Sequence, residues 1–194
     1  MPEPYKVKEL AVKYDTPDTR FTYEDYCRMP AGLRYELVEG DIRMVPSPSV
    51  SHQAVSKRLQ RLLMEWIEDQ SLGEVYDAPI DVVLDQHNVV QPDLLYISRE
   101  RLGIITKPNI QGAPDLVVEI LSPSTTEWDR VTKRRAYERY GVRELWVVDP
   151  EGQSIEVAAR KETRLETLQV YPRGTTMTSP ILPGFALDVD QLFR

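Results

Sequence analysis

The stretch from Pro114 to Pro150, PDLVVEILSPSTTEWDRVTKRRAYERYGVRELWVVDP, decides the fold that we expect for this chain. It begins at residues 116–121 with an apolar run rich in β-branched side chains, which is typical of a strand buried on both faces of a sheet. Residues 145–148 have the same character. The segment between them has a helical pattern, so the stretch predicts a strand, a helix and a second strand joined by a right-handed crossover.

Both ends of the predicted helix carry recognisable signals. Ser124 and Glu127 have the spacing of a capping box, which would start the helix. Gly141 directly follows Tyr140 and is well placed as the C-terminal cap. The sequence therefore predicts a helix over residues 124–140.

One acid interrupts the first strand. Glu119 lies within the apolar run, where an ionised carboxylate is costly unless it is paired, hydrogen-bonded or bound to a cation. The predicted helix offers partners, because Asp129, Lys133 and Tyr137 recur at every fourth position and share one face. A strand built for stability alone would not place an acid there. We therefore treat Glu119 as a candidate site residue, with a structural ion pair to Lys133 or an arginine as the alternative.

Further elements are expected on both sides of this stretch. They are a helix over 22–29, a hairpin over 33–45 that turns at 39–41, a helix over 50–68, strands over 75–84 and 89–98, a helical turn over 98–102, a loop over 107–113, and strands over 154–159 and 165–171. The fold class is α/β (α+β), in one domain over 1–194. It has an N-terminal arm at 1–20, a core at about 21–150 and a C-terminal β extension at 151–194.

Composition limits the possible functions. The chain has 194 residues, of which 41% are hydrophobic and 28% are charged, as expected for one soluble globular domain. Its net charge of −7 counts against tight nonspecific binding of nucleic acid, so any such contact must be local. Basic residues gather in two groups, which are either local contacts or solvated helix faces: Lys57, Arg58 and Arg61, and then Arg130, Lys133, Arg134, Arg135, Arg139 and Arg143.

The cellular location is also constrained by the sequence. Cys27 is the only cysteine, which excludes a disulfide framework and a thiolate zinc site. The start, MPEPYKVKEL, carries charges and prolines where a signal peptide has an apolar run, and no later segment is long enough to span a membrane. We expect a cytoplasmic protein without a membrane partner.

A second acid precedes another buried strand. Asp93 follows Pro92, and residues 94–97 are apolar. Two carboxylates on neighbouring strands can hold a hard divalent cation such as Mg²⁺, which would offset the cost of burying Asp93 and Glu119. Such an ion favours phosphodiester hydrolysis, and Lys133 could orient the nucleophile or balance charge. The alternatives are that Asp93 forms a turn and that Lys133 pairs with Asp129 on the helix surface.

Four segments of the chain carry a family resemblance: YELVEGDIRMVPSPSVSHQ, QPDLLYIS, PDLVVEILSPST and DRVTKRRAYERYGVRELWVVDP. In this order they resemble the Uma2 family of endonucleases, formerly a domain of unknown function, over roughly residues 21–150. Through the similarity of that family to PD-(D/E)XK nucleases, Asp93 matches the first acid and Glu119 the second. The resemblance implies a restriction-endonuclease-like core, a mixed sheet flanked by helices, Mg²⁺ or Mn²⁺ at the acids, DNA as substrate, and a homodimer or higher homo-oligomer.

The chain departs from the nuclease motif at one position. The motif has a lysine two residues after the second acid, where this chain has Leu121. Lys133 resembles a relocated equivalent, since its long side chain can reach a site from an adjacent element. The family's recurrent motifs also contain a set of supporting residues: Glu36, Glu39, His52, Ser124, Asp129 and Tyr137. Each also has an ordinary structural interpretation, as a polar hairpin position, a cap or a packing residue.

These observations predict a metal-dependent endonuclease that hydrolyses phosphodiester bonds of DNA. Leu121 and the acidic net charge support an alternative, a catalytically inactive nuclease-like fold used for nucleic-acid binding or assembly. A weaker alternative is another class of hydrolase that uses the two acids as general acid and base.

Overall fold

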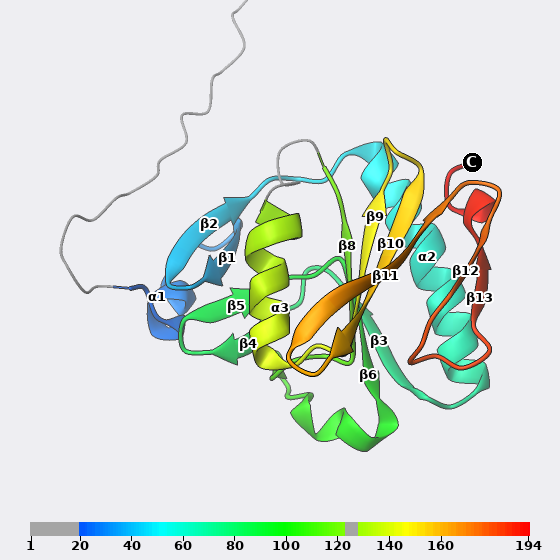
Figure 1. Ribbon diagram of the computed structural model, residues 1–194. Helices are drawn as coiled ribbons and strands as arrows, with labels where there is room; N and C mark the ends of the chain where they lie inside the picture. Colours follow the sequence, from blue (N-terminus) through cyan, green and yellow to red (C-terminus); the bar gives the residue numbers. More distant parts are fainter. Residues whose placement is uncertain (1–19, 123–127) are drawn as a thin grey trace, which may run out of the picture.

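The computed structural model of the protein describes residues 20–122 and 128–194 and contains two main β-sheets (Figure 1). One sheet has six strands in the order β11-β10-β9-β8-β6-β3, and the other has five in the order β2-β1-β5-β4-β7. The strands are β1 (Arg34–Val38), β2 (Asp41–Val45), β3 (Gly73–Asp77), β4 (Val82–Asp85), β5 (Asn88–Val90), β6 (Leu94–Ser98), β7 (Ile110–Gln111), β8 (Leu116–Ile120), β9 (Glu144–Asp149), β10 (Ser154–Lys161) and β11 (Arg164–Pro172), with a separate pair β12 (Thr176–Thr178) and β13 (Ala186–Asp188).

Three helix ends have recognisable caps. Thr22 and Asp25 form a capping box at α1 (Tyr23–Cys27), and the Ser49 side chain accepts a hydrogen bond at the start of α2 (Val50–Asp69). Gly141 ends α3 (Arg134–Tyr140) in the left-handed conformation with φ +91°. A π-helix, η2 (Trp128–Lys133), leads into α3, and 3₁₀ turns form η1 (Arg99–Ile104) and η3 (Val189–Gln191).

The predicted strand, helix and strand are present in the described part of the chain. β8 and β9 are parallel neighbours in the six-stranded sheet, and α3 lies between them in sequence. Because β6 pairs with β8 in the antiparallel sense, the sheet is mixed, as predicted. The expected capping box at Ser124 and Glu127 lies outside the described residues.

The two strands predicted over 75–84 and 89–98 are each divided between the two sheets. β3 pairs with β6 in the six-stranded sheet, whereas β4 pairs with β5 in the five-stranded sheet. Pro79 and Pro92 stand at the divisions, and proline cannot donate a ladder hydrogen bond. The chain therefore crosses from one sheet to the other and back. The predicted loop over 107–113 also contains a short strand, β7, beside β4.

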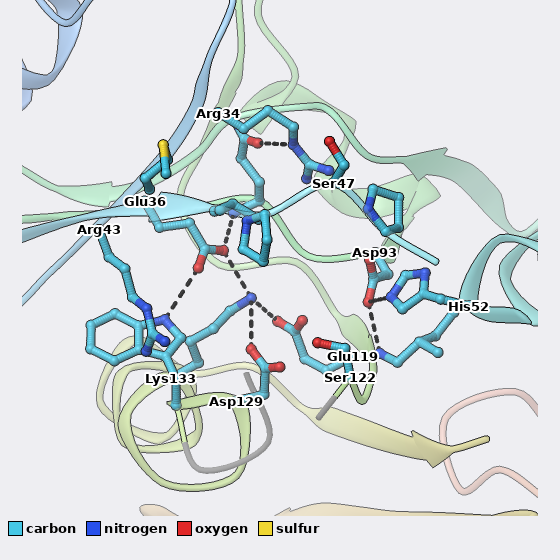
Figure 2. Close-up of a pocket in the computed structure, with 17 residues that line it drawn as sticks. Arg34, Glu36, Arg43, Ser47, His52, Asp93, Glu119, Ser122, Asp129 and Lys133 are labelled. Atoms are coloured by element: carbon cyan, nitrogen blue, oxygen red, sulfur yellow. Dashed lines mark hydrogen bonds and ion pairs between the residues drawn. The ribbon is translucent and has the colours of Figure 1, made fainter. Parts of the chain in front are cut away.

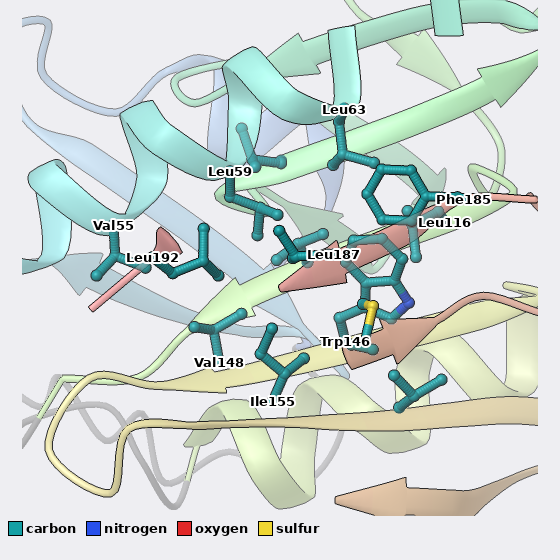
Figure 3. Close-up of a cluster of buried hydrophobic side chains, with 14 of the residues drawn as sticks. Val55, Leu59, Leu63, Leu116, Trp146, Val148, Ile155, Phe185, Leu187 and Leu192 are labelled. Atoms are coloured by element: carbon teal, nitrogen blue, oxygen red, sulfur yellow. The ribbon is translucent and has the colours of Figure 1, made fainter. Parts of the chain in front are cut away.

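The six-stranded sheet is covered on both faces (Figure 1). On one face α2 and the C-terminal segment pack on alternate strand residues, and Trp146 stacks on Phe185 with ring centroids 5.7 Å apart (Figure 3). On the other face lie α3 and the five-stranded sheet. The C-terminal segment docks on the core through its buried residues Leu187, Leu192 and Phe193. Within the two described ranges, no helix is long and apolar enough to cross a membrane.

Candidate functional site

The two predicted acids lie next to each other in the six-stranded sheet. Leu94 pairs with Val118 across β6 and β8, so Asp93 and Glu119 lie opposite each other one position further on. Side chains alternate between the faces of a strand, and Val117 faces the core shared with α3 and the second sheet. Both acids therefore point to that face.

A pocket forms where the two sheets meet above this pair. Its walls come from the β1–β2 hairpin, the following loop, the start of α2, the end of β8 and the π-helix (Figure 2). The described lining residues are Arg34, Glu36, Arg43, Met44, Val45, Pro46, Ser47, Pro48, His52, Gln91, Asp93, Glu119, Ile120, Ser122, Trp128, Asp129 and Lys133.

Asp93 is held at the β8 end of the pocket by two groups. Its Oδ2 accepts the backbone N–H of Ile120 at 2.7 Å and lies 3.3 Å from Nε2 of His52. Burial alone would lower the pKa of His52, but the hydrogen bond and the charge of Asp93 outweigh burial and raise it. Nδ1 of His52 is buried and has no hydrogen-bond partner among the described residues. One polar atom at this end of the pocket is thus left unsatisfied.

Glu119 shares a single cation with two other acids. Nζ of Lys133 lies 2.7 Å from Glu119 Oε1, 2.8 Å from Glu36 Oε1 and 3.6 Å from Asp129 Oδ1 (Figure 2). The Tyr137 hydroxyl donates a short hydrogen bond to Glu119. Lys133 is only 3% exposed and Glu119 only 2%, so these charges interact away from bulk water.

Glu36 brings the second sheet into this cluster. It lies on β1, and its Oε1 accepts the backbone N–H of Gln91 at 2.9 Å in addition to contacting Lys133. Its Oε2 accepts the indole N–H of Trp128 at 3.2 Å. The carboxylate is therefore fixed by donors from three different parts of the chain.

Burial and neighbouring charges shift the pKa values of three groups in this cluster. Burial raises the pKa of Glu119 well above its ordinary value; Lys133 opposes this rise, and Asp129, Asp93 and Glu36 add to it. Burial would lower the pKa of Lys133, but Glu119 and Glu36 raise it well above its ordinary value, so the ammonium form is strongly favoured. Burial and the neighbouring Glu119 also raise the pKa of Tyr137.

The donors fit a hard divalent cation. Asp93 and Glu119 offer carboxylate oxygens from adjacent strands, in a pocket where acids outnumber cations, and Mg²⁺ binds through one or two carboxylates while it keeps several waters. Within residues 20–122 and 128–194, no group of three or more His, Cys, Asp or Glu side chains is placed so that it could hold a metal ion by itself. An ion here would thus depend on the two acids together with water or substrate oxygens.

The structure brings most of the sequence-predicted residues together. Those that meet at the pocket are Glu36, His52, Asp93, Glu119, Asp129 and Lys133, with Tyr137 directly behind Glu119. Glu39 does not join them, because it occupies the hairpin turn with φ +55°, is exposed, and uses its backbone N–H to bond Asn88. Ser124 lies outside the described residues.

Arg34, Arg43, Gln91 and Trp128 are among the lining residues that the sequence did not single out. The signal for the two arginines was available in the hairpin pattern. A residue two positions before Glu36 shares its face of β1, and the hairpin register places Arg43 directly opposite Glu36. For Trp128 and Gln91 the sequence carries no comparable signal, because their places depend on how the sheets pack.

Comparisons with known proteins identify the family and the fold. A family model described as "Uma2: Putative restriction endonuclease" matches residues 22–190. A crystal structure of "a putative nuclease belonging to DUF820 from Anabaena variabilis ATCC 29413" superimposes with a TM-score of 0.75 and 20% sequence identity, and the match covers 89% of this chain and 97% of that one. At this identity the likeness establishes the shared fold. No curated protein matches the chain.

Proposed function

We propose that this chain, which belongs to the Uma2 family of restriction-endonuclease-like proteins, is a metal-dependent endonuclease. It would hydrolyse phosphodiester bonds of DNA. The observation that carries the proposal is the arrangement of Asp93, Glu119 and Lys133. Two acids face each other across adjacent strands, and the Lys133 ammonium lies 2.7 Å from the second acid. This is the chemistry that the nuclease motif requires, with the lysine supplied from the following helix.

Asp93 and Glu119 would hold Mg²⁺ or Mn²⁺. Such an ion, when bound, neutralises charge on a phosphoryl oxygen and lowers the pKa of a coordinated water. His52 and the backbone of Ile120 fix the Asp93 carboxylate by contacts at 3.3 and 2.7 Å. Asp93 is therefore preorganised before any ligand arrives.

Lys133 would orient the nucleophile or balance charge in the transition state. Glu36 acts as a positioning residue, because it holds the ammonium at 2.8 Å while its own carboxylate is fixed by Gln91 and Trp128. If Glu119 turns its charge toward a metal ion, Glu36 keeps Lys133 at the pocket. Leu121, which replaces the lysine of the nuclease motif, is buried in the core instead.

Cleavage of DNA tests the proposal directly. We expect purified protein to cut single-stranded, duplex or branched DNA with Mg²⁺ or Mn²⁺ and to lose this activity in chelator. Asp93→Asn and Glu119→Gln should each lower the rate by about a thousandfold, because several kcal/mol of charge stabilisation is removed. Lys133→Ala should also lower it strongly. Glu68→Gln, at an exposed position of α2, is the matched control and should cut normally.

The binding-module alternative predicts a different result. Leu121 favours it, since a chain without the motif lysine in its usual place could have lost catalysis. In that case the wild type would bind DNA without cutting it in either metal. Calorimetric titration with Mn²⁺ gives an independent answer, because unchanged binding by Asp93→Asn and Glu119→Gln would remove the metal site from these acids.

Two further predictions come from the sequence and the family resemblance. A homodimer or higher homo-oligomer is expected because nucleases of this fold commonly work as dimers, and a monomer by light scattering at micromolar concentration would contradict it. A cytoplasmic location is expected from the single cysteine, and fractionation of cells that express the chain would check it.

A further inference from the structure

A chain with a net charge of −7 needs local cations to hold a polyanion. Several of its basic residues are already engaged by structural acids. Arg130 and Arg134 contact Glu156 at 3.2 and 2.7 Å, and Arg143 contacts Asp115 at 3.2 Å. Arg130 and Arg134 therefore attach η2 and α3 to β10 of the sheet. Besides Lys133, the candidate site is lined by two arginines, Arg34 and Arg43, which come from another element, the β1–β2 hairpin.

The hairpin register places two arginines on the face that forms the pocket wall. Glu36 pairs with Arg43 across the hairpin, and Arg34 pairs with Val45. Residues two apart on a strand share a face, as do directly opposed residues. Arg34, Glu36, Arg43 and Val45 therefore lie on one face, and all four line the pocket. Glu36 thus has Arg34 beside it on β1 and Arg43 opposite it on β2.

Both guanidinium groups are oriented by residues that also orient Glu36. Nε of Arg34 donates to the Gln91 side chain at 2.9 Å, and the Gln91 backbone N–H donates to Glu36. The guanidinium of Arg43 lies 5.0 Å from the centroid of the Trp128 ring, and the indole N–H of Trp128 donates to Glu36. Arginine carries five N–H donors, and the bond to Gln91 uses one of those of Arg34. The two side chains are therefore held in place at the pocket wall by these contacts.

Both arginines of this pocket lie on the hairpin wall, on either side of Glu36. Asp93, Glu119 and Asp129 lie on its inner side with Lys133, and the arginines lie on the hairpin wall (Figure 2). A phosphate can approach the acids only where a cation intervenes, but it is attracted directly by arginine, whose planar donors match phosphate oxygens. A small molecule with one phosphodiester would contact only the inner side of the pocket. A polynucleotide strand would contact the inner side and the arginines of the hairpin wall.

We infer that Arg34 and Arg43 bind backbone phosphates of the substrate strand adjacent to the phosphate held at Asp93 and Glu119. The inference rests on the proposed function, since it takes that site as the place of cleavage. It assigns the β1–β2 hairpin to substrate binding and makes a nucleic-acid strand, with several phosphates in a row, the substrate class.

Binding by fluorescence anisotropy tests the inference separately from catalysis. Labelled single-stranded and duplex oligonucleotides would be titrated with protein in Ca²⁺, over a series of salt concentrations. The double variant R34Q/R43Q should bind roughly tenfold more weakly than the wild type, because two charged phosphate contacts are lost. The slope of log K against log salt should fall by about 0.9 per lost contact on duplex, or about 0.7 on a single strand.

Matched variants give the result its meaning. R61Q removes the same charge from an exposed position on α2, where Arg61 pairs with Glu65 at 3.5 Å, and should change neither affinity nor slope. R34K and R43K keep the charge, so they should keep most of the salt slope; they also replace the glutamine variants if those do not fold. Equal loss in R61Q, or an unchanged slope in R34Q/R43Q, would overturn the inference.

A small substrate separates this inference from the proposed function. Bis(p-nitrophenyl) phosphate has one phosphodiester, so R34Q/R43Q should lose a much larger factor in kcat/KM on DNA than on this small substrate, with the loss on DNA mainly in KM. Equal loss on both substrates would place the arginines at the reacting phosphate and contradict the inference. If the wild type cuts neither substrate, the proposed function fails, and the anisotropy result still decides whether the hairpin binds nucleic acid.

Discussion

Two buried acids lie four positions apart in the chain, one at each end of β8, and their surroundings are opposite. Asp115 has no exposed surface and is matched by donors: the Ser98 N–H at 2.8 Å, Arg101 at 3.1 Å and Arg143 at 3.2 Å. Glu119 shares one ammonium with two further acids. Asp115 is therefore an acid that supports the fold, whereas Glu119 has only a share of one cation and could accept another.

The pKa directions express the same contrast. Burial would raise the pKa of Asp115, but the Ser98 N–H and the arginines outweigh it and lower the pKa. For Glu119, burial and neighbouring acids prevail and raise the pKa. A buried carboxylate whose surroundings do not match its charge is a good marker of a functional site.

Asp115→Asn gives the largest expected effect on stability. The substitution removes the partner of two arginines in a fully buried position, so the free energy of unfolding should fall by about 3 kcal/mol. Urea denaturation measures this fall. Glu65→Gln, which breaks an exposed ion pair with Arg61, should cost less than about 1 kcal/mol. Equal costs for the two variants would show that Asp115 does not support the fold.

A double-mutant cycle on Lys133 and Glu119 should show a coupling of about 2 kcal/mol in the free energy of unfolding. Lys133→Met should cost more than Glu119→Gln, because it leaves Glu36, Glu119 and Asp129 without their shared cation. After Glu119→Gln, Lys133 still has two acids. The double variant should therefore be less destabilised than the sum of the single ones, and simple additivity would contradict the shared-cation description.

Addition of Mn²⁺ should stabilise the protein through Glu119 and not through Asp115. At a concentration of ten times Kd the gain is about 1.4 kcal/mol, which raises Tm by about 3–6 °C for a chain of this size. Differential scanning calorimetry would detect the shift in the wild type and in Asp115→Asn. Asp93→Asn should lose it, and a shift that persists there would place the ion elsewhere.

The smallest expected effect is the acid dependence of the Asp115 contribution. Because its pKa in the folded protein lies below that of unfolded aspartate, about 3.9, its ionised form stabilises the fold above that pH. This stabilisation is lost as the pH falls through the folded pKa. The stability difference between wild type and Asp115→Asn should therefore shrink in urea titrations at pH 3 relative to pH 7. A difference that grows in acid would have the wrong sign.

The sequence predicted the part of the fold that depends on local pattern. The apolar runs around Glu119 and Trp146 predict β8 and β9. Asp129, Lys133 and Tyr137 lie four positions apart, so they share one face, and this face lies beside Glu119. That spacing holds even though the first turn is a π-helix. Glu119 can be recognised from the sequence alone because the residues on both sides of it are apolar. The centre of the candidate site could therefore be predicted.

The rest depends on contacts between distant segments. The sequence gives no local sign that β4 and β5 leave the six-stranded sheet, beyond the prolines at 79 and 92. Asp115 follows a proline and precedes a strand, as Asp93 does, and only the arrival of Arg101 and Arg143 distinguishes the two. Arg34 and Arg43 gain their place because the hairpin docks over the acids.

The division of the strands between two sheets has a consequence for how the protein should fail under stress. Glu36 lies on β1 of one sheet, whereas Asp93 directly precedes β6 and Glu119 lies on β8 of the other. A small separation of the two sheets would break the contact between Glu36 and Lys133, while the backbone hydrogen bonds within each sheet remained intact. Mild heating should therefore abolish the proposed nuclease activity before circular dichroism detects any loss of β-structure. Cooling should restore the activity.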